Sequence, residues 1–161
     1  MTEPLDLAGL VDNFVHEPTQ VHDGGIDLTV SAIYRVDEPG RIDFGGEEQR
    51  DAGLSPLETV RHDADDAYEW WHLEAGQYVI QYNEFLVDED GIRLYLQPRN
   101  ELLARGGIHP SLHVERHLPL VPLSVPDGGL EIKENARLST LVLPDRSGAQ
   151  AAANTVSSDR E

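Results

Sequence analysis

The stretch IDLTVSAIY (residues 26–34) follows a pair of glycines and is rich in residues that favour β-strands. Its polar and apolar residues alternate in part, as in a strand with one buried face. Four later segments have the same character: QYVIQYNEFLV (77–87), IRLYLQ (92–97), LPLVPLSV (118–125) and ARLSTLVL (136–143). Turn-forming runs such as DEDG and PDGG separate them. This spacing, with one or two short helices between, predicts a mainly β protein built as a compact barrel or sandwich.

The chain has 161 residues, which is enough to bury the core of one domain. We expect a single domain over residues 1–143 and a disordered polar tail over residues 144–161. No apolar run is long enough to cross a bilayer, and the N-terminal residues lack the basic start of a signal peptide. With no cysteine, the chain offers no thiolate for a metal. We expect a soluble, cytoplasmic protein with no membrane partner.

The charge of the chain limits its partners further. Asp and Glu number 30 against 12 Lys and Arg, which gives a net charge of -18. Lys133 is the single lysine, so nearly all the cations are arginines. A surface of this kind suggests adaptation to molar salt, as in a halophile. Because no basic face is available to displace counterions from phosphates, we expect no nucleic-acid partner.

Histidines recur every fourth residue in the segment IHPSLHVERH (108–117). The candidate metal ligands are His109, His113, Glu115 and His117. On a helix the three histidines would share one face, but Pro110 and the β-branched Val114 disfavour a helix. On a strand the same residues alternate with apolar ones, and they could face a metal as in cupin-type barrels. The alternative is a polar strand face or a subunit interface.

The preceding segment PRNELLARGG (98–107) has the character of a phosphate-binding turn. Asn100 is the expected N-cap of a short helix, whose free N–H groups would attract an anion. Arg99 and Arg105 could hold phosphate oxygens bidentately. The alternative is an ordinary capped helix whose arginines pair with nearby acidic residues.

The order of these motifs resembles that of the dCTP deaminase and trimeric dUTPase family over roughly residues 10–143. The matching segments are QVHDGGIDLTV (20–30), LEAGQYV (73–79), the strand containing Glu84, PRNELLARG (98–106) and NARLSTLVL (135–143). They correspond to family patterns such as Q-x-x-G-[VI]-D-L-T-V and P-R-S-S-L-x-R-x-G. The resemblance implies a distorted β-barrel of the β-clip type that forms a homotrimer with nucleotide sites between subunits.

The resemblance also implies a ligand and a chemistry. The ligand would be a pyrimidine deoxynucleoside triphosphate, dCTP or dUTP, with Mg²⁺ bridging its phosphates. The reaction would be dCTP deamination or dUTP hydrolysis. Carried across position by position, the nucleotide-binding residues would be Asp27, Glu84, Arg99, Asn100 and Arg105.

Several departures from the family pattern fall at the chemistry itself. Asn100 and Glu101 replace the two serines of the phosphate motif, and the second arginine is displaced by one residue to Arg105. The histidine segment replaces the base-pocket loop, the deaminase glutamate falls near Ser124, and the final glutamine is Thr140. These changes imply an eroded active site, for which Glu115 is the candidate substitute catalytic residue.

Three functions therefore stay open. The first is a dCTP deaminase-like or dUTPase-like hydrolase. The second is a catalytically inactive homotrimer that binds a nucleotide or a protein. The third is a cupin-like metal-binding barrel that uses His109, His113, Glu115 and His117.

Overall fold

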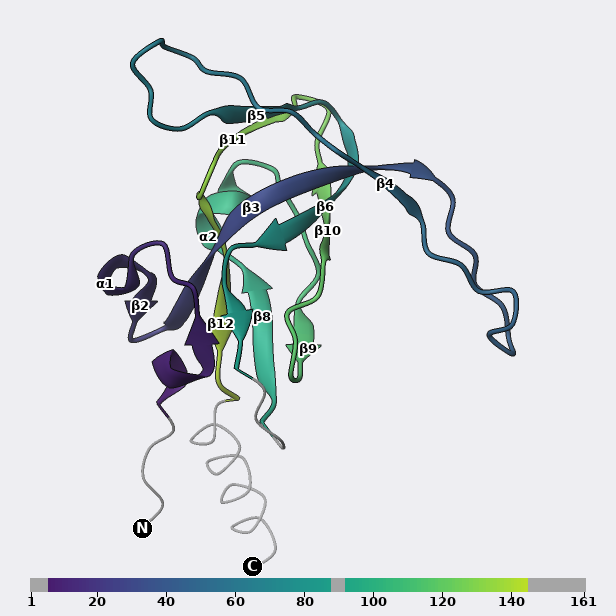
Figure 1. The fold of residues 1–161 in the computed structure, drawn as a ribbon, viewed down its shortest axis with the longest axis horizontal. Coiled ribbons are helices and arrows are strands. Elements are labelled where there is room, and N and C mark those ends of the chain that lie inside the picture. Colours follow the sequence, from purple (N-terminus) through teal and green to yellow (C-terminus); the bar gives the residue numbers. More distant parts are fainter. Residues whose placement is uncertain (1–5, 88–91, 145–161) are drawn as a thin grey trace, which may run out of the picture.

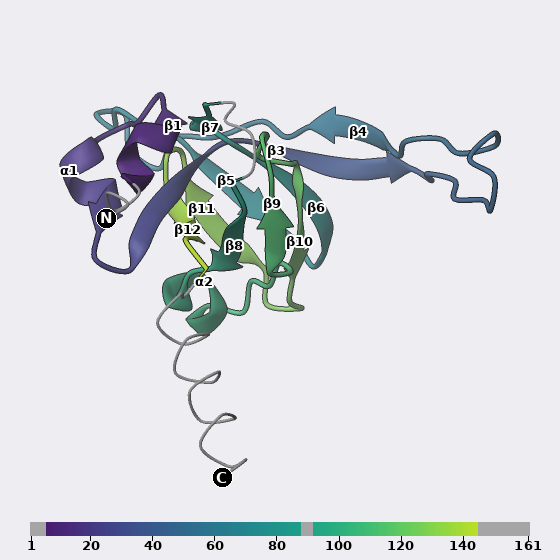
Figure 2. The ribbon, with the colours of Figure 1, turned by 90° about the horizontal axis from the view of Figure 1, so that it is seen from below.

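The computed structural model describes residues 6–87 and 92–144, and it is mainly β, as the sequence predicts (Figure 1). One sheet dominates, with the antiparallel strand order β10-β6-β3-β12-β8-β9. Its strands are β3 (Gly25–Glu38), β6 (Gly76–Tyr82), β8 (Leu94–Pro98), β9 (Leu112–Val114), β10 (Val121–Val125) and β12 (Arg137–Val142). Figure 2 shows that the sheet curls strongly, as in part of a barrel. The expected distorted barrel is confirmed to this extent.

Smaller elements surround this sheet. Strands β2 (Val21–His22) and β4 (Gly53–Pro56) both pair with β3, and β1 (Val11–Asp12) pairs with β7 (Phe85–Leu86). A separate ribbon joins β5 (Trp70–Leu73) to β11 (Leu130–Lys133) and lies at the top of Figure 1. The helices are the 3-10 turn η1 (Leu7–Leu10), α1 (Glu17–Gln20) and α2 (Asn100–Ala104). No helix within the described residues has the length and apolar character needed to cross a membrane.

Strand β3 organises the core because both of its faces are covered over its first half. Ile26, Leu28 and Val30 are fully buried among apolar residues, while the intervening Asp27 and Thr29 are buried in polar surroundings. The strand begins at Gly25, whose φ of +135° is in the region that favours glycine. A Cβ there would lie 2.3 Å from the carbonyl oxygen of Leu141. A glycine is therefore required where β3 enters the sheet.

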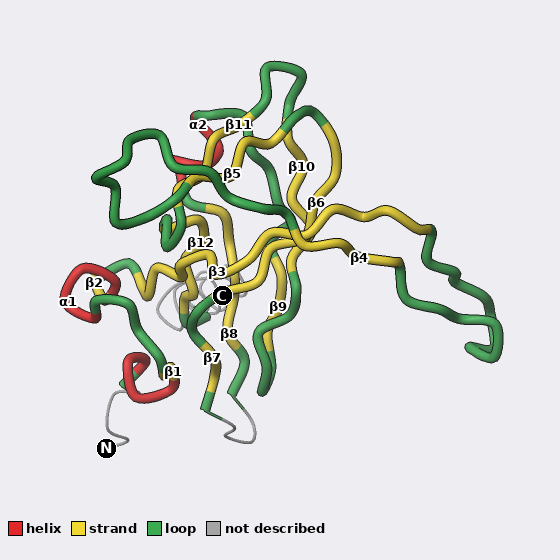
Figure 3. The backbone as a smooth tube through the Cα atoms, turned by 45° about the horizontal axis from the view of Figure 1, so that its top comes forward, coloured by secondary structure: helices red, strands yellow, loops and turns green. Residues whose placement is uncertain are grey.

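Beyond the core, β3 continues with β4 into a long arm that projects from the body of the molecule (Figure 3). Its tip carries two exposed apolar side chains, Ile42 (95% exposed) and Phe44 (108%). The second half of β3 and strand β4 form the two antiparallel sides of this arm.

Element boundaries differ from the predictions where the backbone turns. The predicted strand 77–87 divides into β6 and β7 at Asn83 and Glu84, and β10 begins at Val121. Helix α2 begins at Asn100 with Arg99 as its N-cap, and no side chain caps it. The prediction of Asn100 as N-cap is therefore wrong by one residue. Apart from Pro144, the predicted tail over residues 144–161 lies outside the described residues.

Candidate functional site

A pocket of about 250 Å³ opens where β3, β8 and β12 meet helix α2. It is lined by His22, Asp27, Gln97, Pro98, Arg99, Asn100, Glu101 and Thr140. The strand register explains this gathering, because Thr140 of β12 lies opposite Asp27 on one side and Gln97 on the other. The phosphate segment of the sequence analysis then continues from Gln97 into the helix.

Asp27 is the centre of the pocket's polar network, although its side chain is only 2% exposed. Thr140 Oγ1 donates a hydrogen bond to Oδ1 at 2.9 Å, and His22 Nε2 lies 2.8 Å from the same oxygen. Arg137 Nη1 donates to Oδ2 at 3.0 Å, and Arg99 Nε lies 3.4 Å from it. Both carboxylate oxygens are thus occupied.

These contacts determine the ionisation of Asp27. Burial alone would raise the pKa of its carboxyl group, because a charge is poorly solvated in the interior. The hydrogen bonds from His22 and Thr140 and the positive charge of Arg99 outweigh burial, so the pKa lies below its ordinary value. Asp27 is an ionised anchor for cations and a poor proton acceptor.

The two arginines that contact Asp27 are Arg99 and Arg137, whereas the sequence pointed to Arg99 and Arg105. Arg99 is 16% exposed, lies 3.3 Å from the Glu101 carboxylate through Nη2, and donates from Nη1 to the carbonyl oxygen of Arg137. Arg105 is exposed and folds back, donating to the carbonyl oxygen of Glu101 at 2.9 Å. The structure therefore brings Arg99 and Arg137 to Asp27. Arg99 lines the pocket, whereas Arg137 and Arg105 do not.

Sequence reasoning also missed His22 as a pocket residue. His22 precedes the tight Asp23–Gly24 turn, which reverses the chain and places β2 beside the first residues of β3. The signal available in the sequence was a polar residue five positions before Asp27, on the other side of a tight turn.

Glu84, which the resemblance implies as a nucleotide-binding residue, lies in a buried hydrogen-bonded network. It is 3% exposed and accepts hydrogen bonds from the Thr29 backbone N–H at 2.7 Å, from Gln20 Nε2 at 3.0 Å, and from the Thr29 hydroxyl. Gln20 Nε2 also contacts the carbonyl oxygen of Asp27 at 2.9 Å. Glu84 therefore ties β3 to helix α1 and does not line the Asp27 pocket.

His109 belongs to a buried hydrogen-bonded chain. Nδ1 lies 2.9 Å from the carbonyl oxygen of Pro110 and so donates, which leaves Nε2 to accept from the Ser139 hydroxyl at 2.8 Å. Ser139 in turn accepts from the Tyr82 hydroxyl. Burial lowers the pKa of His109 despite the bond to Pro110, and burial raises the pKa of Tyr82. The lone pair of His109 that could bind a metal is already used.

The other members of the histidine segment point to different surroundings. His113 packs against the Tyr95 ring with 4.4 Å between centroids, and Glu115 pairs with Arg93 at 2.8 Å. His117 lines a separate pocket of about 480 Å³ beside β7. Strand β9 has only three residues, and Arg116 has a φ of 65°, which interrupts the alternation assumed from the sequence. The structure does not bring these four residues together.

Within the described residues, one group of side chains has the spacing of metal ligands: His62, His72 and Glu131. These residues lie on and beside the β5–β11 ribbon, and none of them lines the Asp27 pocket. The sequence analysis did not select them.

Comparison with known proteins gives a consistent set of relatives, although no family model matches the sequence. A Methanosarcina mazei protein is 25% identical over 138 residues, covering 83% of this chain and 77% of that protein. An Archaeoglobus fulgidus protein is 30% identical over 102 residues, covering 63% of this chain and 56% of the relative. One from Methanococcoides burtonii is 29% identical over 97 residues, covering 60% and 54%. Each is named a probable deoxyuridine 5'-triphosphate nucleotidohydrolase. The chain spans about half the length of the last two relatives.

Proposed function

We propose a function for this chain as a divergent member of the dUTPase-like family. The function is binding of a pyrimidine deoxynucleoside triphosphate, dUTP or dCTP, through its phosphates at the Asp27 pocket. Turnover of the bound nucleotide, by dUTP hydrolysis or dCTP deamination, is weak or absent.

The observation that carries the proposal is the convergence of Arg99 and Arg137 on one carboxylate at the pocket. Arg99 lines the pocket and can present N–H donors to a phosphate group, and Arg137 adds a second positive charge beside Asp27. Gln97, Asn100 and Thr140 add neutral hydrogen-bonding groups to the lining. The pocket therefore suits an anion with many acceptor oxygens better than it suits an apolar ligand.

The size of the pocket supports a site that is shared between subunits. A volume of about 250 Å³ is below the 300–1,000 Å³ of typical ligand pockets. A phosphate group with part of a sugar fits this space, but a whole nucleotide needs further walls. We propose that neighbouring subunits of a homotrimer supply them.

Magnesium fits this pocket through Glu101. The described lining includes two carboxylates, and both oxygens of Asp27 are occupied, whereas the Glu101 side chain is 58% exposed. Mg²⁺ is commonly held by one or two carboxylates together with phosphate oxygens and water. Glu101 would hold the ion, and bound Mg²⁺ would neutralise phosphate charge. Without the ion, Glu101 repels a triphosphate.

Weak or absent turnover follows from how the predicted carboxylates are engaged in the described part of the chain. Asp27 is kept ionised by its donors, and Glu84 accepts three hydrogen bonds. Glu115 pairs with Arg93 and does not line the pocket. A group that activates water must be within hydrogen-bond reach of that water and able to take its proton. None of these three residues meets both conditions.

The proposal is tested by thermal shift in high KCl with dUTP, dCTP and ATP, each with and without Mg²⁺. A nucleotide present at a hundred times its Kd adds about 2.7 kcal/mol to the unfolding free energy, which corresponds to several degrees in Tm. Arg99→Gln should remove most of the shift, because Arg99 lines the pocket, and Arg105→Gln serves as the matched control outside the pocket. Absence of a shift with every nucleotide contradicts binding, and rapid release of pyrophosphate or ammonia contradicts weak turnover.

A further inference from the structure

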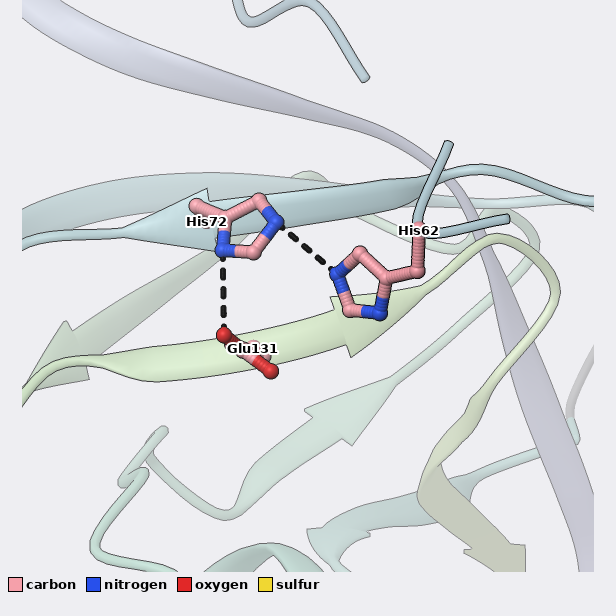
Figure 4. A group of neighbouring side chains, drawn as sticks. All are labelled: His62, His72 and Glu131. Carbon is pink, nitrogen blue, oxygen red and sulfur yellow. Dashed lines mark hydrogen bonds and ion pairs between the residues drawn. The ribbon is translucent and has the colours of Figure 1, made fainter. Parts of the chain in front are cut away.

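His62, His72 and Glu131 form a compact group on the outer ribbon of the molecule (Figure 4). The Nε2 atoms of His62 and His72 lie 2.9 Å apart, and His72 Nδ1 lies 3.1 Å from Glu131 Oε1. All three side chains are exposed. The group is independent of the nucleotide pocket, because the two sites share no residue.

The backbone and one aromatic ring hold these side chains in place. His72 of β5 and Glu131 of β11 are direct partners in the antiparallel register. His62 comes from the loop before β5, where Val60 and Trp70 exchange two backbone hydrogen bonds of 2.9 and 2.8 Å. The His62 ring stacks on Trp70 with 4.6 Å between centroids and an interplanar angle of 5°. Its position is thus set by stacking as well as by the loop.

The hydrogen bonds assign the protons within the group. An ionised Glu131 can only accept, so the contact at 3.1 Å requires a proton on His72 Nδ1. Neutral His72 then has a bare lone pair on Nε2, directed at His62 Nε2. The 2.9 Å between the two Nε2 atoms fits a hydrogen bond with one proton between them. A cation in place of that proton would meet two nitrogen donors at once.

We propose that His62 and His72 bind a divalent transition metal, Zn²⁺ foremost, through their Nε2 atoms. Glu131 orients His72 from the opposite ring nitrogen, as carboxylates commonly do for histidines that bind metals. Two nitrogens at about 2.0–2.1 Å from a tetrahedral Zn²⁺ lie about 3.3 Å apart. The present separation of 2.9 Å therefore needs only a small opening of two exposed side chains. The remaining ligands are water, because the group is open to solvent.

A metal here would fasten the loop of residues 57–69 to the β5–β11 ribbon. Apart from the contacts of His62, the described side-chain hydrogen bonds that hold this loop to its surroundings lie at its two ends. The Trp71 indole donates to the carbonyl oxygen of Leu57 at 3.3 Å, and the Glu69 backbone N–H donates to Glu134 Oε1 at 2.7 Å. The proposed role is structural.

The test is calorimetric titration of the untagged full chain with Zn²⁺ at neutral pH in high KCl. One Zn²⁺ per chain is expected, and His62→Ala and His72→Ala should each remove this binding. Glu131→Gln should weaken it about 10- to 100-fold, the usual effect of losing such a partner. His117→Ala is the matched control, an exposed histidine outside the group. Unchanged binding in His62→Ala or His72→Ala, no binding by the wild type, or loss in the control overturns the proposal.

A second measurement uses the wild-type protein and so does not depend on how the variants fold. Side-chain ¹⁵N NMR during the titration should move the Nε2 resonances of His62 and His72, while His72 Nδ1 keeps its proton. Coordination through His72 Nδ1 would contradict the role assigned to Glu131.

Discussion

Replacing Asp27 with asparagine removes one buried charge and leaves the shape of the side chain almost unchanged. The carboxylate is contacted by four groups: Thr140, His22, Arg137 and Arg99. Asparagine keeps one acceptor oxygen, which can still receive Thr140. Its amide group, however, is a donor facing the N–H groups of the arginines. The variant therefore tests how much of the fold's stability depends on this ionised centre.

The expected loss can be worked out from the exposure of the partners. Removing one member of a fully buried ion pair costs about 3–5 kcal/mol because the other charge is left uncompensated. Here the side chain of Arg137 is 36% exposed and that of Arg99 is 16% exposed, so water solvates part of the freed charge. We therefore expect a loss of about 2–3 kcal/mol, or roughly 4–12 °C in Tm for a chain of this size.

The lowered pKa of Asp27 also predicts how the stability difference between wild type and Asp27→Asn changes with pH. The folded pKa of Asp27 lies below the ordinary value of 3.8, so the native state favours the ionised form. The stabilisation is fully present above pH 3.8 and is lost as the pH falls through the lower folded value. The difference between wild type and Asp27→Asn should thus be constant near neutral pH and shrink in acid.

The assay is urea unfolding followed by circular dichroism in high KCl, at neutral pH and in acid. Asp127→Asn, in the exposed turn before β11, is the matched control and should change little. Two results would refute the reasoning: a midpoint unchanged at neutral pH, or a loss equally large in strong acid.

Three further predictions concern other parts of the molecule. Because burial lowers the pKa of His109, the fold should lose stability as the pH falls below its ordinary value of 6.5, and His109→Gln should flatten that dependence in urea unfolding between about pH 5 and 7. Glu101→Ser should raise the affinity for dUTP measured without Mg²⁺ about tenfold, because it removes a carboxylate close to the phosphates, and the gain should vanish with Mg²⁺ present. If the arm contacts a neighbour in the proposed homotrimer, Ile42→Ser with Phe44→Ser should lower the mass measured by light scattering; an unchanged trimer would place the interface elsewhere.

The main sheet could be predicted because its signals are local. A glycine pair followed by a β-branched and apolar run marks β3, and short turns mark the ends of the later strands. The same run contains Asp27 and Thr29, whose burial in polar surroundings was not predicted. The identity of the network's partners was not local, since Arg137 and Thr140 lie 110 and 113 residues away from Asp27.

For a related reason, the regular spacing of histidines in residues 108–117 did not predict which side chains lie together. Regular spacing of histidines is informative only if one regular element carries them, and β9 is too short to do so. The group that does form depends instead on pairing between WWHL and LEIK, which are four-residue strands about 60 positions apart. Neither strand was predicted, so nothing placed Glu131 beside His72.

The charges around the nucleotide pocket assign different parts to its two carboxylates. Asp27 is buried and occupied by four groups, so an incoming phosphate cannot displace it from the arginines without breaking the fold's own network. The Glu101 side chain is exposed, and its carboxylate contacts Nη2 of Arg99 at 3.3 Å, so the carboxylate can move away at little cost. A phosphate therefore competes with Glu101 for Arg99, while Arg137 stays paired with Asp27. Glu101, the residue that makes the pocket least like a phosphate site, is thus also the residue whose charge Mg²⁺ can neutralise.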